Sequence, residues 1–361
     1  MQTEIIAPLI LMLVKSVVCF GAFMLVLAYV TLLERRMLAF FQLRYGPNRV
    51  GPLGLLQPLA DGIKMLCKED VTVTLAESKI YILAPIVCTV AAFIPFAVIP
   101  FGNSIWPAAM TIGGRVCDFT LYHASTAVVA DVDAGLLYVF AVSSLSVFGL
   151  MMAGWSSNNK YSLLGGIRAS AQMISYELAA ALCLISIIMA AGSMNLVEIA
   201  RAQEGYSLGF LPNWFCFRQP LAFVLFLVAL FAETGRTPFD FTECDNELVA
   251  GYQTEYSSMK FALFYLAEYA HLITGSALLV TMFFGGWQGP YVSAPGFGYI
   301  LPVVYFCLKV LAVLCSFVWV RATYPRFRYD LLMQIGWKVL LPAALANILL
   351  APFFMKLWGE F

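Results

Sequence analysis

Charged residues are scarce in this 361-residue chain. Lys, Arg, Asp and Glu make up only 12% of it, whereas hydrophobic residues make up 61%. An ordinary soluble protein carries about 25% charged residues, because polar side chains must cover its surface. The composition therefore excludes a soluble globular protein and a disordered one, and it indicates a chain that lies in a lipid bilayer. The 21 basic and 21 acidic residues balance, so nothing favours nucleic acid as a partner.

Ligands for metals and cofactors are equally sparse. The chain has nine cysteines, but the closest pair is eight residues apart, and its two histidines are His123 and His271. An iron–sulfur cluster, a zinc site or a bis-histidine haem held by this chain alone is therefore not expected. Neither a G-x-x-x-x-G-K-[ST] motif nor a complete G-x-G-x-x-G motif occurs, which argues against a nucleotide phosphate site.

The most prominent feature of the sequence is a series of long apolar runs. A membrane-spanning helix needs about 20 apolar residues, because lipid offers no hydrogen-bond partner to an open backbone. Eight runs meet or approach this length, and they cover residues 7–33, 80–101, 134–154, 169–192, 219–235, 259–286, 298–320 and 338–356. The fifth is the shortest, and the first is expected to be a retained helix because it lacks the marks of a signal peptide. The pattern predicts an all-α polytopic membrane protein, a single transmembrane domain over residues 1–361 with eight spans.

The basic residues predict the orientation of these spans. Fifteen of the 21 Lys and Arg residues fall on one side, mostly in the segments that follow the first and seventh spans. The positive-inside rule places that side in the cytoplasm or the mitochondrial matrix. Both termini should then face the opposite side, in agreement with an even number of spans.

Four ionisable side chains fall inside the predicted spans: Lys15, Glu177, Glu268 and Lys309. A charge in mid-membrane costs at least ~2.5 kcal/mol, so each needs a partner, a water cavity or a change of protonation. The two lysines can extend toward an interface or pair locally. The short side chains of Glu177 and Glu268 favour a role in proton handling, and neutral carboxyls kept for packing are the alternative.

The densest charged feature is the segment 233–255. Its single base, Arg236, stands among six acids, namely Glu233, Asp240, Glu243, Asp245, Glu247 and Glu255. A solvated acidic loop is one interpretation. However, Phe239, Phe241 and Tyr252 alternate with the acids, so much of the segment should pack against other elements. Carboxylates crowded in a low dielectric cannot all ionise, and such a cluster can take up or release protons when a neighbour changes charge.

A short amphipathic helix is predicted after the first span. Leu55, Leu59, Ile63 and Leu66 share one helical face in a segment too short and too charged to cross the membrane. It should lie in the membrane interface, after a glycine- and proline-rich turn that carries Arg49. Such a helix can frame an entrance for a lipid-soluble molecule or serve as a docking face for a peripheral protein.

Three strings of the sequence resemble one family. LLERRMLAFFQLRYGPNRVGPLGLLQPLADGIKMLCKE, AETGRTPFDFTECDNELVAGYQTEYSSMKFALFYLAEY and WVRATYPRFRYDLLMQIGWK are similar to the signature regions of the chain 1 (H-type) membrane subunits of proton-pumping NADH:quinone oxidoreductase, respiratory complex I. The resemblance covers most of the chain in order. One departure is Gly235, where the family commonly has Asn.

The resemblance implies a function shared with other subunits. In that family this type of chain forms the entrance and much of the tunnel for a quinone, while the FMN and iron–sulfur clusters belong to partner subunits, so this chain alone would hold no cofactor, metal or complete catalytic site. Its partners would be the soluble quinone-module subunits, the adjacent membrane-arm subunits and membrane lipids. Segment 34–79 would form the quinone entrance and segment 233–260 the acidic loop.

The family's functional positions match two sets of residues in this chain. The quinone-binding set is Glu34, Arg35, Asp61, Lys64, Arg321 and Arg326. The proton- and charge-coupling set is Glu177, Glu233, Asp240, Glu243, Asp245, Glu247, Glu255 and Glu268.

Two other functions remain open from the sequence. One is the homologous membrane subunit of a membrane-bound hydrogenase or formate-oxidising complex, and the other is a stand-alone proton-coupled transporter. The sequence favours a bacterial inner membrane, with the mitochondrial inner membrane as the alternative, and does not choose between ubiquinone and menaquinone.

Overall fold

The chain forms a bundle of long helices. The computed structural model describes residues 2–102, 109–112, 115–118, 127–207, 211–240, 248–289 and 300–357. The α-helices are α1 (Gln2–Phe41), α2 (Gln57–Cys67), α3 (Ser78–Phe93), α4 (Gly135–Ser143), α5 (Leu145–Ser156), α6 (Lys160–Ala191), α7 (Leu196–Arg201), α8 (Phe215–Arg218), α9 (Pro220–Glu233), α11 (Ser258–Phe283), α12 (Ile300–Thr323), α13 (Tyr329–Gln334) and α14 (Leu341–Leu357). Short 3₁₀ turns η1 (Pro52–Gly54), η2 (Ile94–Val98) and η4 (Gly251–Gln253) and a π-helical turn η5 (Ile335–Leu340) join them.

Strands contribute little to the described residues. They form two small antiparallel hairpins, one of β1 (Ala109–Ile112) with β2 (Arg115–Asp118) and one of β3 (Tyr206–Ser207) with β4 (Leu211–Pro212). Both hairpins lie outside the long helices, so the predicted all-α class is confirmed. Half of the long loop between the second and third predicted spans lies outside the described residues.

Seven of the eight predicted spans coincide with helices that are long and apolar enough to cross a membrane. Among the described residues these are Ile10–Phe41, Ser78–Val98, Gly135–Ser156, Lys160–Ala191, Ser258–Phe283, Ile300–Thr323 and Tyr329–Lys356. The fifth predicted span is the 14-residue helix α9. At 1.5 Å per residue, α9 would extend about 21 Å, less than the ~30 Å of a bilayer core. An eighth crossing therefore stays a prediction.

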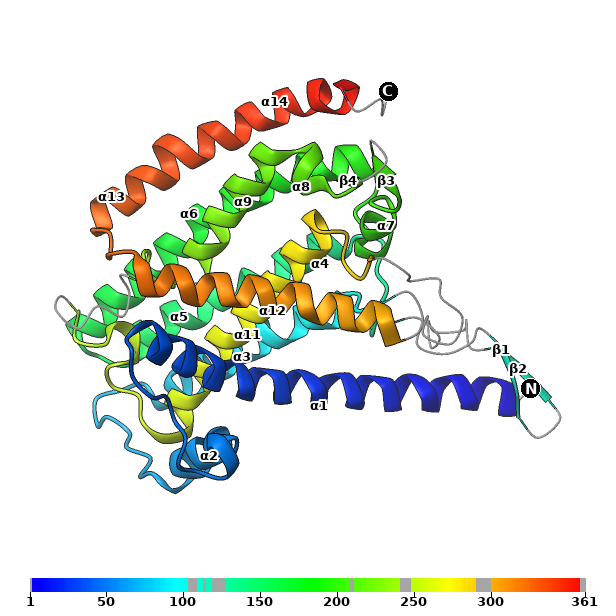
Figure 1. Ribbon diagram of the computed structural model, residues 1–361. Coiled ribbons are helices and arrows are strands. Elements are labelled where there is room, and N and C mark those ends of the chain that lie inside the picture. The colour runs from blue at the N-terminus through cyan, green and yellow to red at the C-terminus, as the bar shows by residue number, and fades with distance from the viewer. Residues whose placement is uncertain are drawn as a thin grey trace.

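Helices α6 and α11 form the centre of the bundle. α6 packs against α5, α9 and α14, while α11 packs against α3 and α12. In Figure 1, α1 runs along one edge and the continuous α13–α14 rod along the opposite edge, with α12 between them. α11 is the most enclosed of the seven candidate spans and α1 the least. The exposed apolar surface of α1 suits contact with lipid or with another membrane protein.

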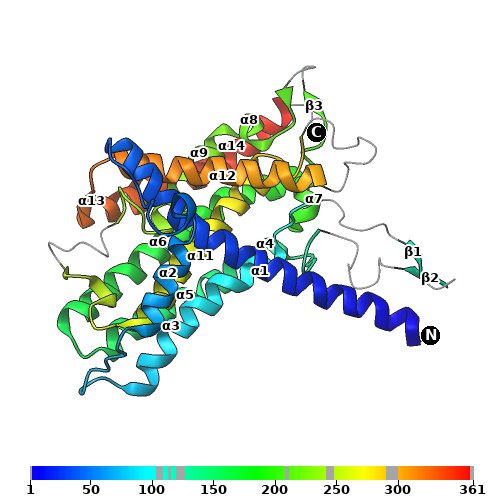
Figure 2. The same ribbon diagram turned by 60° about the horizontal axis from the view of Figure 1, so that its bottom comes forward.

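The two segments that carry most of the predicted site residues meet at one end of the bundle. The C-terminal ends of α1 and α12 and the N-terminal end of α11 lie there together with α2 (Figures 1 and 2). α6 reaches this end as well, where a Cβ atom on Gly165 would lie 2.6 Å from the Cα atom of Gly251. The glycine pair lets the C-terminal part of the acidic segment lie directly on α6.

The amphipathic helix α2 forms as predicted. It follows a compact turn in which a Cβ atom on Gly54 would lie only 2.3 Å from the carbonyl oxygen of Pro47. Its side chains Leu59, Ile63 and Leu66 are 63%, 53% and 65% exposed. Such an uncovered apolar face suits a helix that rests in the membrane interface.

Gly235 ends the helical run that begins at Pro220. Its φ angle is +62°, in the left-handed region, and an added Cβ atom would have no neighbour within 4 Å. The choice of residue at position 235 is therefore limited by the backbone conformation and not by the volume of the side chain. Glycine and asparagine adopt this conformation most readily, which accounts for the exchange of these two residues between this chain and the family it resembles.

Candidate functional site

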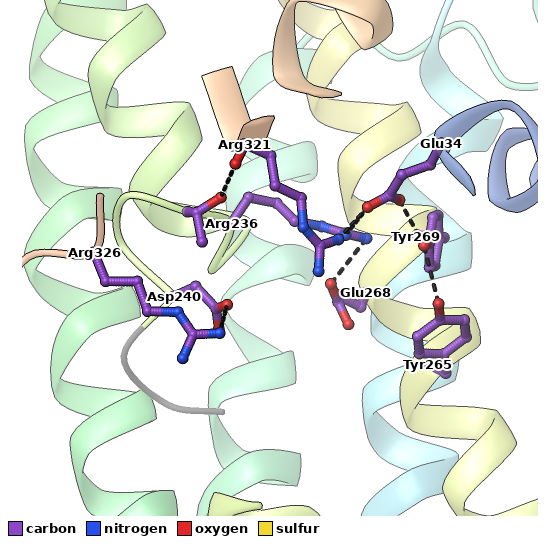
Figure 3. A network of polar contacts seen from close by, with 9 residues as sticks. Glu34, Arg236, Asp240, Tyr265, Glu268, Tyr269, Arg321 and Arg326 are labelled. Atoms are coloured by element: carbon purple, nitrogen blue, oxygen red, sulfur yellow. Dashed lines mark hydrogen bonds and ion pairs between the residues drawn. The ribbon is translucent and has the colours of Figure 1, made fainter. Parts of the chain in front are cut away.

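A buried ionic cluster joins three helices and a loop at this end of the bundle. Glu34 of α1 accepts hydrogen bonds from Arg236 (Nη1 to Oε1, 2.9 Å), from Arg321 of α12 through Nη1, and from Tyr269 of α11 (OH to Oε2, 2.6 Å). The other terminal nitrogen of Arg236, Nη2, lies 2.9 Å from Glu268 Oε1. Figure 3 shows the two guanidinium groups and two carboxylates converging. The structure thus unites a predicted quinone-binding residue, Glu34, with a predicted coupling residue, Glu268.

Arg236 is the shared member of this cluster. It is 5% exposed and Glu34 is 4% exposed, so water screens their interaction poorly. Its guanidinium also stacks 4.5 Å from the ring centre of Tyr269. Burial alone would lower the pKa of Arg236, but the nearby carboxylates of Glu268 and Glu34 outweigh it and raise the pKa well above its usual value. Arg236 therefore stays charged, and any proton uptake in the cluster falls to its carboxylates.

The loop that carries Arg236 is fixed by polar contacts to its backbone. The side-chain amide of Gln172, in α6, donates to the carbonyl oxygens of Ala232 and Phe239, both at 2.9 Å. Thr237 Oγ1 donates to the carbonyl oxygen of Arg321 at 3.4 Å. These contacts hold the loop between α6 and α12, so the guanidinium is positioned before any ligand arrives.

A second ion pair ties the chain after α12 to the same loop. Arg326 Nη2 lies 3.2 Å from Asp240 Oδ2, and the backbone N–H of Phe327 donates to the carbonyl oxygen of Pro238 at 3.0 Å. Arg326 is half-exposed while Asp240 is buried. The two predicted sets of residues therefore meet here for a second time.

The remaining predicted entrance residues lie on the outer side of α1. Arg35 Nη1 contacts Asp61 Oδ2 of α2 at 2.6 Å, and Gln57 donates to the other oxygen of Asp61 at 3.1 Å. Consecutive residues on an α-helix point about 100° apart, so Glu34 faces the cluster while Arg35 faces α2. Lys64 is exposed and is not brought into the cluster.

The other predicted coupling residues are spread along the bundle. Glu177 accepts a hydrogen bond from Ser143 Oγ at 3.3 Å, and Glu255 accepts one from Asn159 at 2.6 Å. Three more, Glu243, Asp245 and Glu247, lie outside the described residues. Glu233 lines a cavity of about 70 Å³ whose wall also includes Glu268. The cavity thus joins the ionic cluster to the interior of the bundle.

Several residues of this site do not stand out in the sequence. Arg236 enters there only as the lone base of an acidic segment, and nothing singles out the tyrosine pair Tyr265 and Tyr269 (OH to OH, 3.0 Å). The sequence does contain a feature that could have identified Arg236, because one base among six acids and several aromatic residues should become the buried counter-ion of those acids.

The two intramembrane lysines pair locally, which was one of their two expected arrangements. Lys15 Nζ donates to the carbonyl oxygen of Val128 at 2.6 Å. Lys309 Nζ donates to the carbonyl oxygens of Phe284, Gly286 and Gln288 at 2.6–3.1 Å. Both charges are thus satisfied by backbone at bends and helix ends.

The chemistry open to this site is binding and proton exchange. Within the part of the chain that the structure describes, no group of three or more His, Cys, Asp or Glu side chains is arranged to hold a metal ion. The cluster instead offers charged donors and ionisable acceptors beside an apolar helix at the bundle end. The fold and the site together define a class of protein: a polytopic membrane protein with a buried ionic cluster at one end of its helical bundle.

Comparison with known proteins places the chain within that class. The family model described as NADH dehydrogenase matches residues 14–352. An NADH-quinone oxidoreductase H subunit of Geobacter sulfurreducens is 47% identical over 96% of this chain and 95% of its own length. The NADH-quinone oxidoreductase H subunit of Rhodospirillum rubrum is 46% identical over 91% of this chain and 89% of its own. The chain belongs to this NADH dehydrogenase family, and the resemblance seen in its sequence is confirmed.

Proposed function

We propose that this chain is the membrane subunit of an NADH:quinone oxidoreductase that admits a quinone and converts its reduction into proton movement. The names and near-complete coverage of its relatives support the subunit assignment. They also favour it over the hydrogenase-type subunit and the stand-alone transporter. The bacterial origin of these relatives supports a bacterial inner membrane as its location.

One observation carries the proposal: Arg236 contacts Glu34 with one terminal nitrogen and Glu268 with the other, each at 2.9 Å. Glu34 lies at the predicted entrance, and Glu268 lies in a membrane-spanning helix. A change of charge near Glu34 would therefore alter the electrostatic environment of Glu268 through a single rigid guanidinium.

The proposed sequence of events begins at α2. A quinone enters from the bilayer beside the exposed leucines of α2, with its isoprenoid tail against apolar side chains and its headgroup toward the basic residues. Reduction gives the headgroup two electrons and creates a demand for two protons. The new negative charge attracts Arg236 and Arg321, since unit charges ~4 Å apart near a protein surface interact by about 4 kcal/mol. As the hold of Arg236 on Glu268 weakens, Glu268 takes up a proton.

Electron transfer itself belongs to other subunits in this proposal. FMN and iron–sulfur clusters in partner chains would deliver the electrons, and adjacent membrane subunits would receive the protonation signal. This chain would contribute the quinone path, the charged cluster and the carboxylates behind it. Arg35, Asp61 and Lys64 would line the entrance, while Asp240 and Arg326 would link the loop to α12.

Replacing Glu268 with Gln tests the coupling role. The amide keeps the size and one acceptor oxygen but cannot exchange a proton, so coupled quinone reduction should fall about tenfold or more. NADH-driven quinone reduction and vesicle acidification are measured together in membranes that contain the assembled complex. Arg328→Gln, at an exposed pair with Asp330 outside both predicted sets of residues, is the control and should retain most of both activities. Unchanged acidification in Glu268→Gln would contradict the proposal.

A further inference from the structure

Two buried polar atoms at the centre of the bundle lack protein partners. Within the described residues, Gln172 Oε1 and His271 Nε2 make no hydrogen bond. Gln172 is only 2% exposed, and its amide nitrogen is used twice by the loop backbone. Both residues line the cavity of about 70 Å³ that also contains Glu233 and Glu268. Buried polar atoms in native proteins are nearly always satisfied, so two unsatisfied atoms on residues that line the same cavity indicate a polar occupant.

A smaller cavity lies next to the first. It has a volume of about 30 Å³ and shares the wall residues Glu233, Thr234 and His271 with the larger one. Its far side includes Ser143, whose hydroxyl donates to Glu177. His271 and Glu233 therefore stand between a cavity that reaches Glu268 and a cavity that reaches the partner of Glu177.

Both cavities have the size and lining that water requires. A buried water molecule needs about 10–15 Å³ of accessible space and two to four polar partners. The other polar groups of the larger cavity are already engaged, since Cys88 donates to Ser146 O and Tyr252 accepts from Gln253. The available partners for water are thus Gln172 Oε1, His271 Nε2 and the two carboxyl groups.

We propose that these two cavities form a hydration site, in which Gln172 Oε1 and His271 Nε2 hold water. In this site His271 positions the water molecule that connects Glu268 with Glu233 and Glu177. The inference rests on the proposed function, because it assigns His271 to the proton path of the same site. His271 is a positioning residue here: it acts through the water that it holds.

Three variants of the assembled complex test this role. His271→Leu removes the polar atom at similar volume, whereas His271→Gln places an amide near the position of Nε2. Thr281→Val is the matched control, because Thr281 is a buried residue of the same helix α11 that lines neither cavity, and its hydroxyl already donates to Ala277 O at 2.9 Å. Proton translocation in vesicles should fall by about tenfold or more in His271→Leu, remain within about twofold of wild type in His271→Gln, and stay unchanged in Thr281→Val.

The outcomes separate this inference from the proposed function. Wild-type translocation in His271→Leu would overturn the inference, and so would a loss in His271→Gln as deep as that in His271→Leu. A high-resolution structure of the assembled complex should show water within hydrogen-bond distance of both Gln172 Oε1 and His271 Nε2, and a dry cavity would overturn it too. Failure of the proposed function would appear differently, as quinone reduction without proton translocation in the wild-type complex.

Discussion

Replacing Arg236 with Gln is expected to abolish coupled quinone reduction, with a loss of about 100-fold or more. The buried guanidinium is the only group that contacts both Glu34 and Glu268 among the described residues. Removing one partner of a buried ion pair costs about 3–5 kcal/mol, so the variant should also assemble less stably. Arg236→Lys should be intermediate, because a single ammonium group cannot reach both carboxylates in the same planar geometry.

The measurement is NADH:quinone reductase activity per assembled complex, with the amount of complex determined on native gels. Normalising to assembly separates lost chemistry from lost protein. Arg328→Gln is the control, because it removes an arginine from an exposed pair with Asp330 and should cost far less. Full activity in assembled Arg236→Gln would remove the link on which the proposed mechanism depends.

Replacing Glu34 with Gln is expected to lower quinone reduction by about tenfold to 100-fold while leaving assembly largely intact. The carboxylate of Glu34 accepts from Arg236, Arg321 and Tyr269. Its neutralisation raises the net charge of the cluster by one and leaves Arg236 to Glu268 alone. Arg321 is partly exposed and can be hydrated, so the cost to folding should be modest. The loss should therefore appear in turnover.

Turnover and apparent quinone affinity are measured in the same membranes. Glu34→Asp keeps the charge on a shorter side chain and should recover part of the activity lost in Glu34→Gln. Arg35→Gln, at the next residue of α1, should change turnover by less than Glu34→Gln, because Arg35 faces α2 and not the cluster. Equal losses in Glu34→Gln and Arg35→Gln would show that the buried position of Glu34 has no special role.

The helical framework could be predicted from the sequence because hydropathy and chain geometry decide it locally. Seven spans follow directly from apolar runs of sufficient length. α2 follows from leucines and an isoleucine spaced three and four residues apart. The fifth predicted span corresponds to a helix, but its crossing does not follow in the same way, because α9 is short and its ends are set by contacts such as the hydrogen bond from Gln219 Nε2 to Ser186 O, 3.0 Å, which hydropathy does not register.

The candidate site was predictable in some of its members but not in its pairings. Glu268 stood out as an ionisable residue within a span, and Glu34 was predicted from the resemblance to a known family. The link between them through Arg236 could not be predicted, because Glu34 and Arg236 are 202 residues apart in the chain and meet only when α1 packs near α11. His271 is a similar case: a lone histidine in a span carries no signal until the cavities around it are known. Tertiary packing, and not residue type, determines both roles.

The most direct test of the link between Glu34, Arg236 and Glu268 is an infrared difference spectrum of the assembled complex, recorded as quinone is reduced. We expect a carboxyl protonation band in the wild type that disappears in Glu268→Gln and also in Arg236→Gln, although Arg236→Gln leaves every carboxyl group in place. A band that persists unchanged in Arg236→Gln would contradict the account, because it would show that Glu268 responds to the quinone without the guanidinium between them.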